Sequence, residues 1–329
     1  MATDMPWVVR SDEAPRLGIT KDDLRGGAFA QVRHGVWTVA GLDRDDPDVR
    51  IAAVAARLPE HAVVSGWAAA RVHEMTKVRG DLVVFDGSPR WEVGPARTGG
   101  PARVLVTAPA ETRMAQHRDL RIFRSTVQAD EREVVAGVPV TTALRTAFDL
   151  ARLSSPRAAV VALDRLLHLG LVESSQLRSR IAVARRWRGR PAATRALDLA
   201  DGGAESPQET LLRLVWIQAG RPRPRANVEV RDPSGAFVGR VDLLDPVAGV
   251  VGEYDGAVHA DAGRRRSDHT RHEALEDLGL VVVRAAQGDL ANARAEAAWQ
   301  SRLHAAYTRA RGDPRNWLTS TPSTGARRG

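Results

Sequence analysis

Two apolar segments, residues 238–244 and 248–254, are separated by a short turn, and each carries carboxylates near one end. This pattern predicts an antiparallel hairpin in which Asp242 faces Glu253 across the ladder. Because side chains alternate along a strand, Glu253 and Asp255 are expected on the same face. The sequence therefore predicts that three carboxylates converge at one end of a buried hairpin.

Three converging carboxylates repel one another unless a hard cation neutralises them, and Mg²⁺ (or Mn²⁺) binds a few carboxylates while keeping several waters. Such a metal polarises a scissile phosphate and lowers the pKa of an attacking water, which is the requirement for phosphodiester hydrolysis. Asp242, Glu253 and Asp255 are thus the expected metal ligands and catalytic residues. The alternative is a polar hairpin edge whose acids pair with arginines.

Two further catalytic candidates lie on either side of the hairpin. Residues 206–209 read Ser-Pro-Gln-Glu and open a helix expected over 209–219, so Glu209 is a fourth candidate carboxylate, and Glu205, one turn earlier, is a weaker one. The same spacing is that of a helix cap, which accounts for Glu209 without catalysis. His259 follows Asp255 by four residues and is expected to act as a general base or to orient water, unless it is an ordinary surface histidine.

Charge indicates a polyanionic partner. The chain carries 48 Lys and Arg against 40 Asp and Glu, a net charge of +8, and clustered arginines neutralise phosphates. Near the start of a helix expected over 267–278, four arginines are candidates for DNA phosphate contacts, although an exposed basic helix would look the same. They are Arg264, Arg265, Arg266 and Arg271. A second arginine run surrounds Trp187, where phosphate contact and a solvated basic helix remain equally good explanations.

The N-terminal region contains a short helix expected at residues 21–25 and two short strands within residues 29–39. A turn at residues 34–35 joins the strands, as the wing of a winged helix-turn-helix would require. Arg33 and His34 are therefore candidates for DNA contact. Any small hairpin would have the same pattern.

The chain lacks cysteine, which excludes disulfides, thiolate zinc sites and cysteine nucleophiles. It has no apolar run long enough to span a membrane and no basic segment followed by an apolar run at its start, so we expect a cytoplasmic protein without a membrane partner. Its 329 residues suit several domains. The expected divisions are a winged-helix domain over 1–75, a small α+β module over 76–150 with strands at 82–85, 103–107 and 120–124, a helical basic linker over 151–200, a nuclease-fold domain over 205–311 and a disordered tail over 312–329.

The order of a helix with Glu209, a strand with Asp242, a strand with Glu253 and Asp255, a helix and a strand resembles the PD-(D/E)XK superfamily. The motifs Val241-Asp-Leu, Glu253-Tyr-Asp-Gly, His259 and Ala274-Leu-Glu-Asp-Leu-Gly-Leu-Val-Val-Val-Arg resemble, more narrowly, Vsr-like endonuclease domains. The resemblance covers about the last third of the chain. It implies an α/β restriction-endonuclease-like domain with a central mixed sheet and a Mg²⁺-dependent endonuclease activity. Asp255 occupies the place where the superfamily usually has Lys, which is a departure from its pattern.

The first half resembles the AbiEi-type antitoxin family of type IV toxin–antitoxin systems. The motifs are Gln31-Val-Arg-His-Gly-Val-Trp, Val64-Ser-Gly-Trp-Ala-Ala-Ala, Gly137-Val-Pro-Val-Thr-Thr and Arg145-Thr-Ala-Phe-Asp-Leu-Ala. This resemblance implies an α+β winged-helix region that binds DNA, followed by a small mixed module, and it makes a toxin a conceivable partner.

Three functions are compatible with these patterns. The first is a DNA-binding protein with a metal-dependent endonuclease domain that acts on double-stranded DNA. The second is an antitoxin-like transcriptional regulator whose nuclease fold is catalytically silent. The third, an RNA-processing nuclease, keeps the chemistry and changes the substrate.

Overall fold

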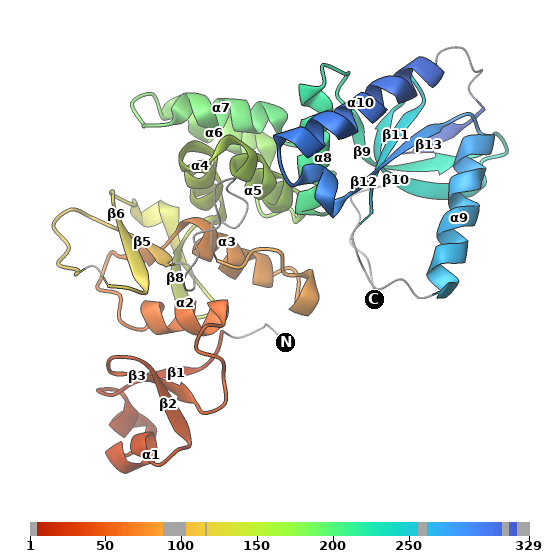
Figure 1. Cartoon of the computed structure of the whole chain (residues 1–329). Helices are drawn as coiled ribbons and strands as arrows, with labels where there is room; N and C mark the ends of the chain where they lie inside the picture. The colour runs from red at the N-terminus through yellow and green to blue at the C-terminus, as the bar shows by residue number, and fades with distance from the viewer. Residues whose placement is uncertain (1–4, 88–102, 116, 256–261, 311–315, 321–329) are drawn as a thin grey trace. The chain divides into compact units, whose positions relative to one another are not determined.

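The computed structural model describes residues 5–87, 103–115, 117–255, 262–310 and 316–320 (Figure 1). The chain separates into two compact units, Met1–Ala200 and Asp201–Gly329. The fold is a mixture of helices and sheets in both units. Within the described residues, no helix combines the length and apolar character that crossing a membrane requires.

The first unit begins with a three-stranded antiparallel sheet of order β1-β3-β2. Its elements are β1 (Val8–Arg10), η1 (Ala14–Leu17), α1 (Lys21–Arg25), β2 (Phe29–Arg33) and β3 (Val36–Val39). Helix α1 begins after Thr20, whose hydroxyl accepts a hydrogen bond from the Asp23 N–H at 3.1 Å. A small core of Val9, Ala14 and Leu24 holds these elements together. The short helix and hairpin expected here are present at the expected residues.

A second sheet in this unit has the order β6-β5-β4-β8-β7. Its strands are β4 (Val63–Val64), β5 (Val104–Ala108), β6 (Leu120–Arg124), β7 (Arg132–Val135) and β8 (Val138–Thr141). Strand β4 lies between β5 and β8, and all three bury valines in one core. The structure therefore has no domain boundary at the expected division between residues 75 and 76, because one sheet contains strands from before and after this position.

The helices of the first unit are α2 (Pro47–Ala55), α3 (Gly66–Met75), η2 (Gly80–Leu82), η3 (Ala129–Glu131), α4 (Ala143–Leu153), α5 (Pro156–His168), α6 (Ser174–Val183) and α7 (Arg190–Leu199). Thr142 caps α4 by accepting a hydrogen bond from the Arg145 N–H at 3.3 Å. Helices α4 to α7 contact one another and bury apolar faces. The region 151–200, expected as a linker, is thus part of the packed unit.

The strand expected at residues 82–85 is absent from the described fold. Its backbone groups bond to side chains instead of to a neighbouring strand. The N–H groups of Val84 and Phe85 donate to the Glu74 carboxylate at 2.9 and 2.7 Å. Arg165 donates to the Leu82 carbonyl at 2.6 Å. Because these groups are satisfied in this way, the segment needs no strand partner.

The second unit is a mixed sheet of order β12-β11-β10-β9-β13. Its strands are β9 (Arg225–Arg231), β10 (Phe237–Asp245), β11 (Val250–Asp255), β12 (Val281–Ala286) and β13 (Leu318–Ser320). Strands β11 and β12 are parallel, and the other neighbours are antiparallel. Strand β13 lies in the segment expected to be a disordered tail; it pairs with β9, which gives its backbone groups partners.

Helices cover both faces of this sheet (Figure 1). They are α8 (Pro207–Gln218) and α10 (Ala293–Arg309) on one face and α9 (Ala262–Asp277) on the other, with η4 (Gln287–Leu290) before α10. The core under α8 and α10 is built on Trp216, Trp299 and Tyr307. The Tyr307 hydroxyl donates a hydrogen bond of 2.6 Å to the buried carboxylate of Asp245.

Tyr307→Phe is expected to lower the free energy of unfolding by about 2 kcal/mol, because a buried carboxylate oxygen loses its hydroxyl donor. Urea unfolding checks this value. Tyr254→Phe is the control, since Tyr254 is the chain's other tyrosine and its hydroxyl has no hydrogen-bond partner among the described residues. Equal effects of the two substitutions would contradict a stabilising role of the Tyr307–Asp245 bond.

Candidate functional site

The candidate site lies where β10 and β11 stop pairing through their backbones. The last backbone pair on this side is Leu243 with Gly252. Beyond it, the carboxylate of Asp242 takes over, and its Oδ2 accepts a hydrogen bond of 2.8 Å from the Tyr254 N–H. The side chain of Asp242 therefore lies against β11 next to Glu253, as the hairpin pattern predicted.

Glu253 is buried and meets a cation. Its Oε1 lies 2.8 Å from Nη1 of Arg271 on α9, forming an ion pair in which the Glu253 side chain is 9% exposed. The pair lacks hydrogen-bond geometry, so Glu253 Oε1 is buried without a hydrogen-bond donor. A buried carboxylate oxygen in this state can still accept a water, an N–H donor or a metal ion.

The pKa of Asp242 reflects its burial and the carboxylates near it. Burial raises the pKa of Asp242 to about 7, and the nearby charges of Glu209 and Glu253 also raise it, whereas the Tyr254 N–H and Arg271 lower it. The ionised form of Asp242 is therefore disfavoured below about pH 7. A cation placed between Asp242 and Glu253 would reverse this preference.

Glu209 is held at the start of α8. Ser206 is the N-cap, with Pro207 next, and its hydroxyl accepts a bond of 3.2 Å from the Glu209 N–H, as the spacing predicted. The Glu209 carboxylate accepts from the Glu205 N–H at 2.9 Å and from the Asn227 amide at 2.6 Å. Glu209 thus joins helix α8 to strand β9 as well as acting on Asp242 through its charge.

Asn227 and Arg240 are neighbours of the site that the patterns did not identify as functional residues. Asn227 has a positive φ of 49° on β9, and no sequence spacing indicates that its amide meets Glu209. Arg240, two residues before Asp242, donates two hydrogen bonds of 2.8 Å to Glu205. The position of Arg240 on the strand of Asp242 is the one signal that would have suggested it.

Asp255, which was predicted to converge with Asp242 and Glu253, does not join the pair. Asp255 is exposed at the end of β11. His259 lies outside the described residues, and Arg264, Arg265 and Arg266 are described only as backbone of α9. Across the ranges that the structure describes, no group of three or more Asp, Glu or His side chains is arranged to hold a metal.

Asp242 and Glu253 nevertheless fit a divalent cation. Their donors are hard oxygens, one of which is buried without a hydrogen-bond donor, and Mg²⁺ commonly takes only one or two carboxylates together with waters. Two carboxylates are a number that a Mg²⁺ site can use.

The N-terminal candidates, Arg33 and His34, lie at a turn whose backbone carbonyls accept hydrogen bonds from other segments. Arg33 is half-buried, and His34 is exposed. The His34 carbonyl accepts a hydrogen bond of 3.1 Å from Arg57, and the Gly35 carbonyl accepts one of 3.0 Å from the Ser11 N–H. The imidazole of His34 is thus the more accessible of the two candidate groups.

The arginine run around Trp187 has a third explanation besides the two left open by the sequence. Arg145, Arg152 and Arg180 place their guanidinium carbons 4.7, 4.9 and 4.9 Å from the Trp187 ring centre. Arg180 also pairs with Glu131 at 2.7 Å. At least this member of the run is therefore held inside the first unit by cation–π and ionic contacts.

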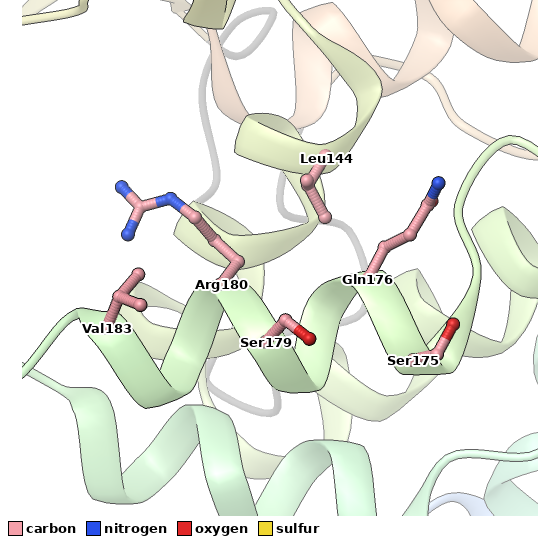
Figure 2. Close-up of a pocket in the computed structure, with 6 residues that line it drawn as sticks. All are labelled: Leu144, Ser175, Gln176, Ser179, Arg180 and Val183. Carbon is pink, nitrogen blue, oxygen red and sulfur yellow. The ribbon is translucent and has the colours of Figure 1, made fainter.

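A hollow of about 530 Å³ lies on the first unit between α4 and α6 (Figure 2). Its lining is Leu144, Ser175, Gln176, Ser179, Arg180 and Val183. The figure shows Leu144 pointing from α4 toward the row of α6 side chains. These lining residues include neither carboxylate nor imidazole, so the hollow offers no acid–base pair, and it belongs to a different unit from Asp242.

No family model matches the chain. "Uncharacterized protein MT2308" and "Uncharacterized protein Rv2248", from the CDC 1551 / Oshkosh and ATCC 25618 / H37Rv strains of Mycobacterium tuberculosis, are each 34% identical to it over 151 residues, or 45% of this chain. The match covers 55% of their length, so the chain spans about half the length of these curated relatives. The crystal structure of RV2827C protein from Mycobacterium tuberculosis matches 64% of this chain and 76% of its own with 16% identity and a TM-score of 0.37. Similarity at this level assigns neither a fold family nor an activity to this chain.

Proposed function

We propose that the chain is a DNA-binding protein whose second unit is a Mg²⁺-dependent endonuclease of the PD-(D/E)XK, Vsr-like type. The observation that carries the proposal is the position of Asp242 and Glu253 side by side on β10 and β11, with the pKa of Asp242 raised to about 7 and Glu253 Oε1 lacking a hydrogen-bond donor. A pair of buried carboxylates in this state is suited to a cation.

In this function Asp242 and Glu253 hold the metal. When bound, Mg²⁺ would supply a Lewis acid for the scissile phosphate and lower the pKa of an attacking water. Glu209 stands close enough to affect the ionisation of Asp242 and keeps α8 fixed against β9. Asp255, exposed at the strand end, is available to substrate or water rather than to the buried pair. His259 keeps its proposed role as a general base.

The N-terminal sheet supports the DNA-binding part of the proposal. Its strand order β1-β3-β2, with η1 and α1 between β1 and β2, is compatible with a winged helix. The turn with His34 would then be the wing, and the five-residue helix α1 would face the DNA groove. The net charge of +8 favours association with a nucleic acid.

The test is incubation of the full chain with supercoiled plasmid in Mg²⁺ or Mn²⁺, followed by the same reaction in EDTA. We expect conversion to nicked or linear plasmid with metal and no conversion in EDTA, because both carboxylates need the cation to act on a phosphate. A structured RNA of similar length is the parallel substrate. An intact plasmid under every metal condition would contradict the endonuclease proposal, and cleavage of the RNA alone would replace DNA by RNA as the substrate.

A second candidate function is an antitoxin-like transcriptional regulator with a silent nuclease fold. The observation that favours it is that the described residues contain a pair of facing carboxylates and no three-ligand group. This function predicts DNA binding that is the same in Mg²⁺ and in EDTA, without cleavage. A toxin would be its partner.

A further inference from the structure

We propose that Arg271 is a built-in cation of the Asp242–Glu253 site, which neutralises Glu253 when no metal is bound and yields this carboxylate to a divalent metal ion. The inference rests on the proposed metal-dependent function. The inference adds that the Arg271 guanidinium and the metal compete for the Glu253 carboxylate. Metal binding therefore also releases Arg271 from its ion pair.

The contacts of Arg271 place its charge beside Glu253 and the backbone of β10. Its Nη1 lies 2.8 Å from Glu253 Oε1 on β11 and donates a hydrogen bond of 2.9 Å to the Arg240 carbonyl on β10. One nitrogen of α9 therefore joins the two strands that carry the candidate ligands. The contact with Glu253 supplies charge without hydrogen-bond geometry, so the carboxylate retains the capacity to bind another cation.

The fold leaves a path for this side chain. A Cβ atom at position 239 would lie 3.0 Å from Cδ and 3.1 Å from Cγ of Arg271. Gly239 thus allows the aliphatic part of Arg271 to cross the backbone of β10 at close range. Any larger residue at position 239 would have to shift the Arg271 side chain. The contact between Arg271 and Glu253 therefore depends on Gly239 of β10 as well as on the position of α9.

The two partners differ in their freedom to move. The Arg271 side chain is 31% exposed, whereas that of Glu253 is 9% exposed. When a metal binds Glu253, the guanidinium is therefore the partner that turns toward solvent, still anchored on α9 beside the site. There it meets a phosphate oxygen of the substrate, to which guanidinium groups donate strong charge-assisted hydrogen bonds.

The first experiment measures Mg²⁺ affinity by calorimetry for the wild-type full chain, Arg271→Gln and Arg271→Lys. Arg271→Gln is expected to bind Mg²⁺ roughly tenfold more tightly, because the metal no longer displaces a partly buried cation. Arg271→Lys keeps the charge and should bind Mg²⁺ with nearly wild-type affinity. The matched control is Arg302→Gln, which removes a cation paired with Asp289 in the same unit and should leave the affinity unchanged.

Nicking separates this role from a structural one. At saturating Mg²⁺, Arg271→Gln is expected to cleave plasmid about a hundredfold more slowly despite its tighter metal binding, because the phosphate loses a charged donor. A purely structural arginine would weaken both properties together. Equal or weaker Mg²⁺ binding by a folded Arg271→Gln protein would overturn the inference alone, whereas no Mg²⁺ binding by wild type and both Arg271 variants would overturn the proposed function as well.

A measurement on the wild type keeps the inference testable if the glutamine variant does not fold. The Nε–Hε NMR signal of Arg271, assigned by its loss in Arg271→Lys, should move during a Mg²⁺ titration with the same midpoint as the calorimetric binding. A signal that stays fixed while Mg²⁺ binds would overturn the competition.

Discussion

Asp242→Asn is expected to slow Mg²⁺-dependent plasmid nicking on the order of a thousandfold, because the substitution removes an anionic ligand from a two-carboxylate metal site. The amide oxygen can still accept the Tyr254 N–H that Asp242 accepts at 2.8 Å, so the local backbone should be retained. Initial rates of nicking in saturating Mg²⁺ measure the loss.

The same substitution should stabilise the metal-free protein at high pH. The pKa of Asp242 is raised from 3.8 to about 7 in the folded state. The folded protein therefore holds the proton more tightly, and this contribution to stability is complete below about pH 4 and is lost as the pH rises toward 7. At pH 8 in EDTA, Asp242→Asn should be more stable by about 2 kcal/mol, a value that allows for partial solvent screening. At pH 4 the two proteins should be nearly equal.

Denaturant unfolding at the two pH values measures this difference. The control for nicking is Asp232→Asn, which changes a partly exposed carboxylate in the β9–β10 turn and should leave the nicking rate unchanged. A variant that loses nicking and also loses stability at pH 8 would indicate a damaged fold, contradicting the role assigned to Asp242.

Glu74→Ala is expected to destabilise the first unit by about 3–5 kcal/mol, because it removes the carboxylate that pairs with the buried Arg165. The Glu74 side chain is fully buried, and it accepts a 2.7 Å bond from Arg165 as well as the N–H groups of Val84 and Phe85. Its removal therefore takes the acceptor from three donors at once, two of them buried. Thermal unfolding followed by circular dichroism measures the loss.

Two further variants identify its cause. Glu60→Ala removes a carboxylate whose side chain is 88% exposed, and it should change stability by less than about 0.5 kcal/mol. The double variant Glu74→Met/Arg165→Met should lose less stability than Glu74→Ala, because no charge remains buried alone. A double variant as unstable as the single one would assign the effect to the backbone donors instead of the ion pair.

The hairpin of the candidate site was predictable because its information is local. Apolar alternation set the strands, and the short turn set the register that brings Asp242 beside Glu253. Asp255 was expected with them because it shares their strand face. It is exposed because β11 ends there, and the end of a strand is set by neighbouring elements rather than by alternation.

Contacts between distant segments were not predictable from spacing. The pairing of Arg271 with Glu253 depends on how α9 packs on the sheet, whereas the residues alone suggested a phosphate contact or an exposed basic helix. The role of the arginine run around Trp187 was not predictable for the same reason, because Arg180 pairs with Glu131, which is distant in the sequence. Strand β13 was missed because its few residues gain their order from pairing with β9.

Mg²⁺ binding by Asp242 and Glu253 is tested most directly by calorimetric titration of the full chain and of Asp242→Asn with Mg²⁺ at pH 8. We predict saturable binding to the wild type and none to Asp242→Asn, although that variant remains folded and more stable. The absence of binding to the wild type, or equal binding to both proteins, would contradict the assignment of this carboxylate pair as a metal site.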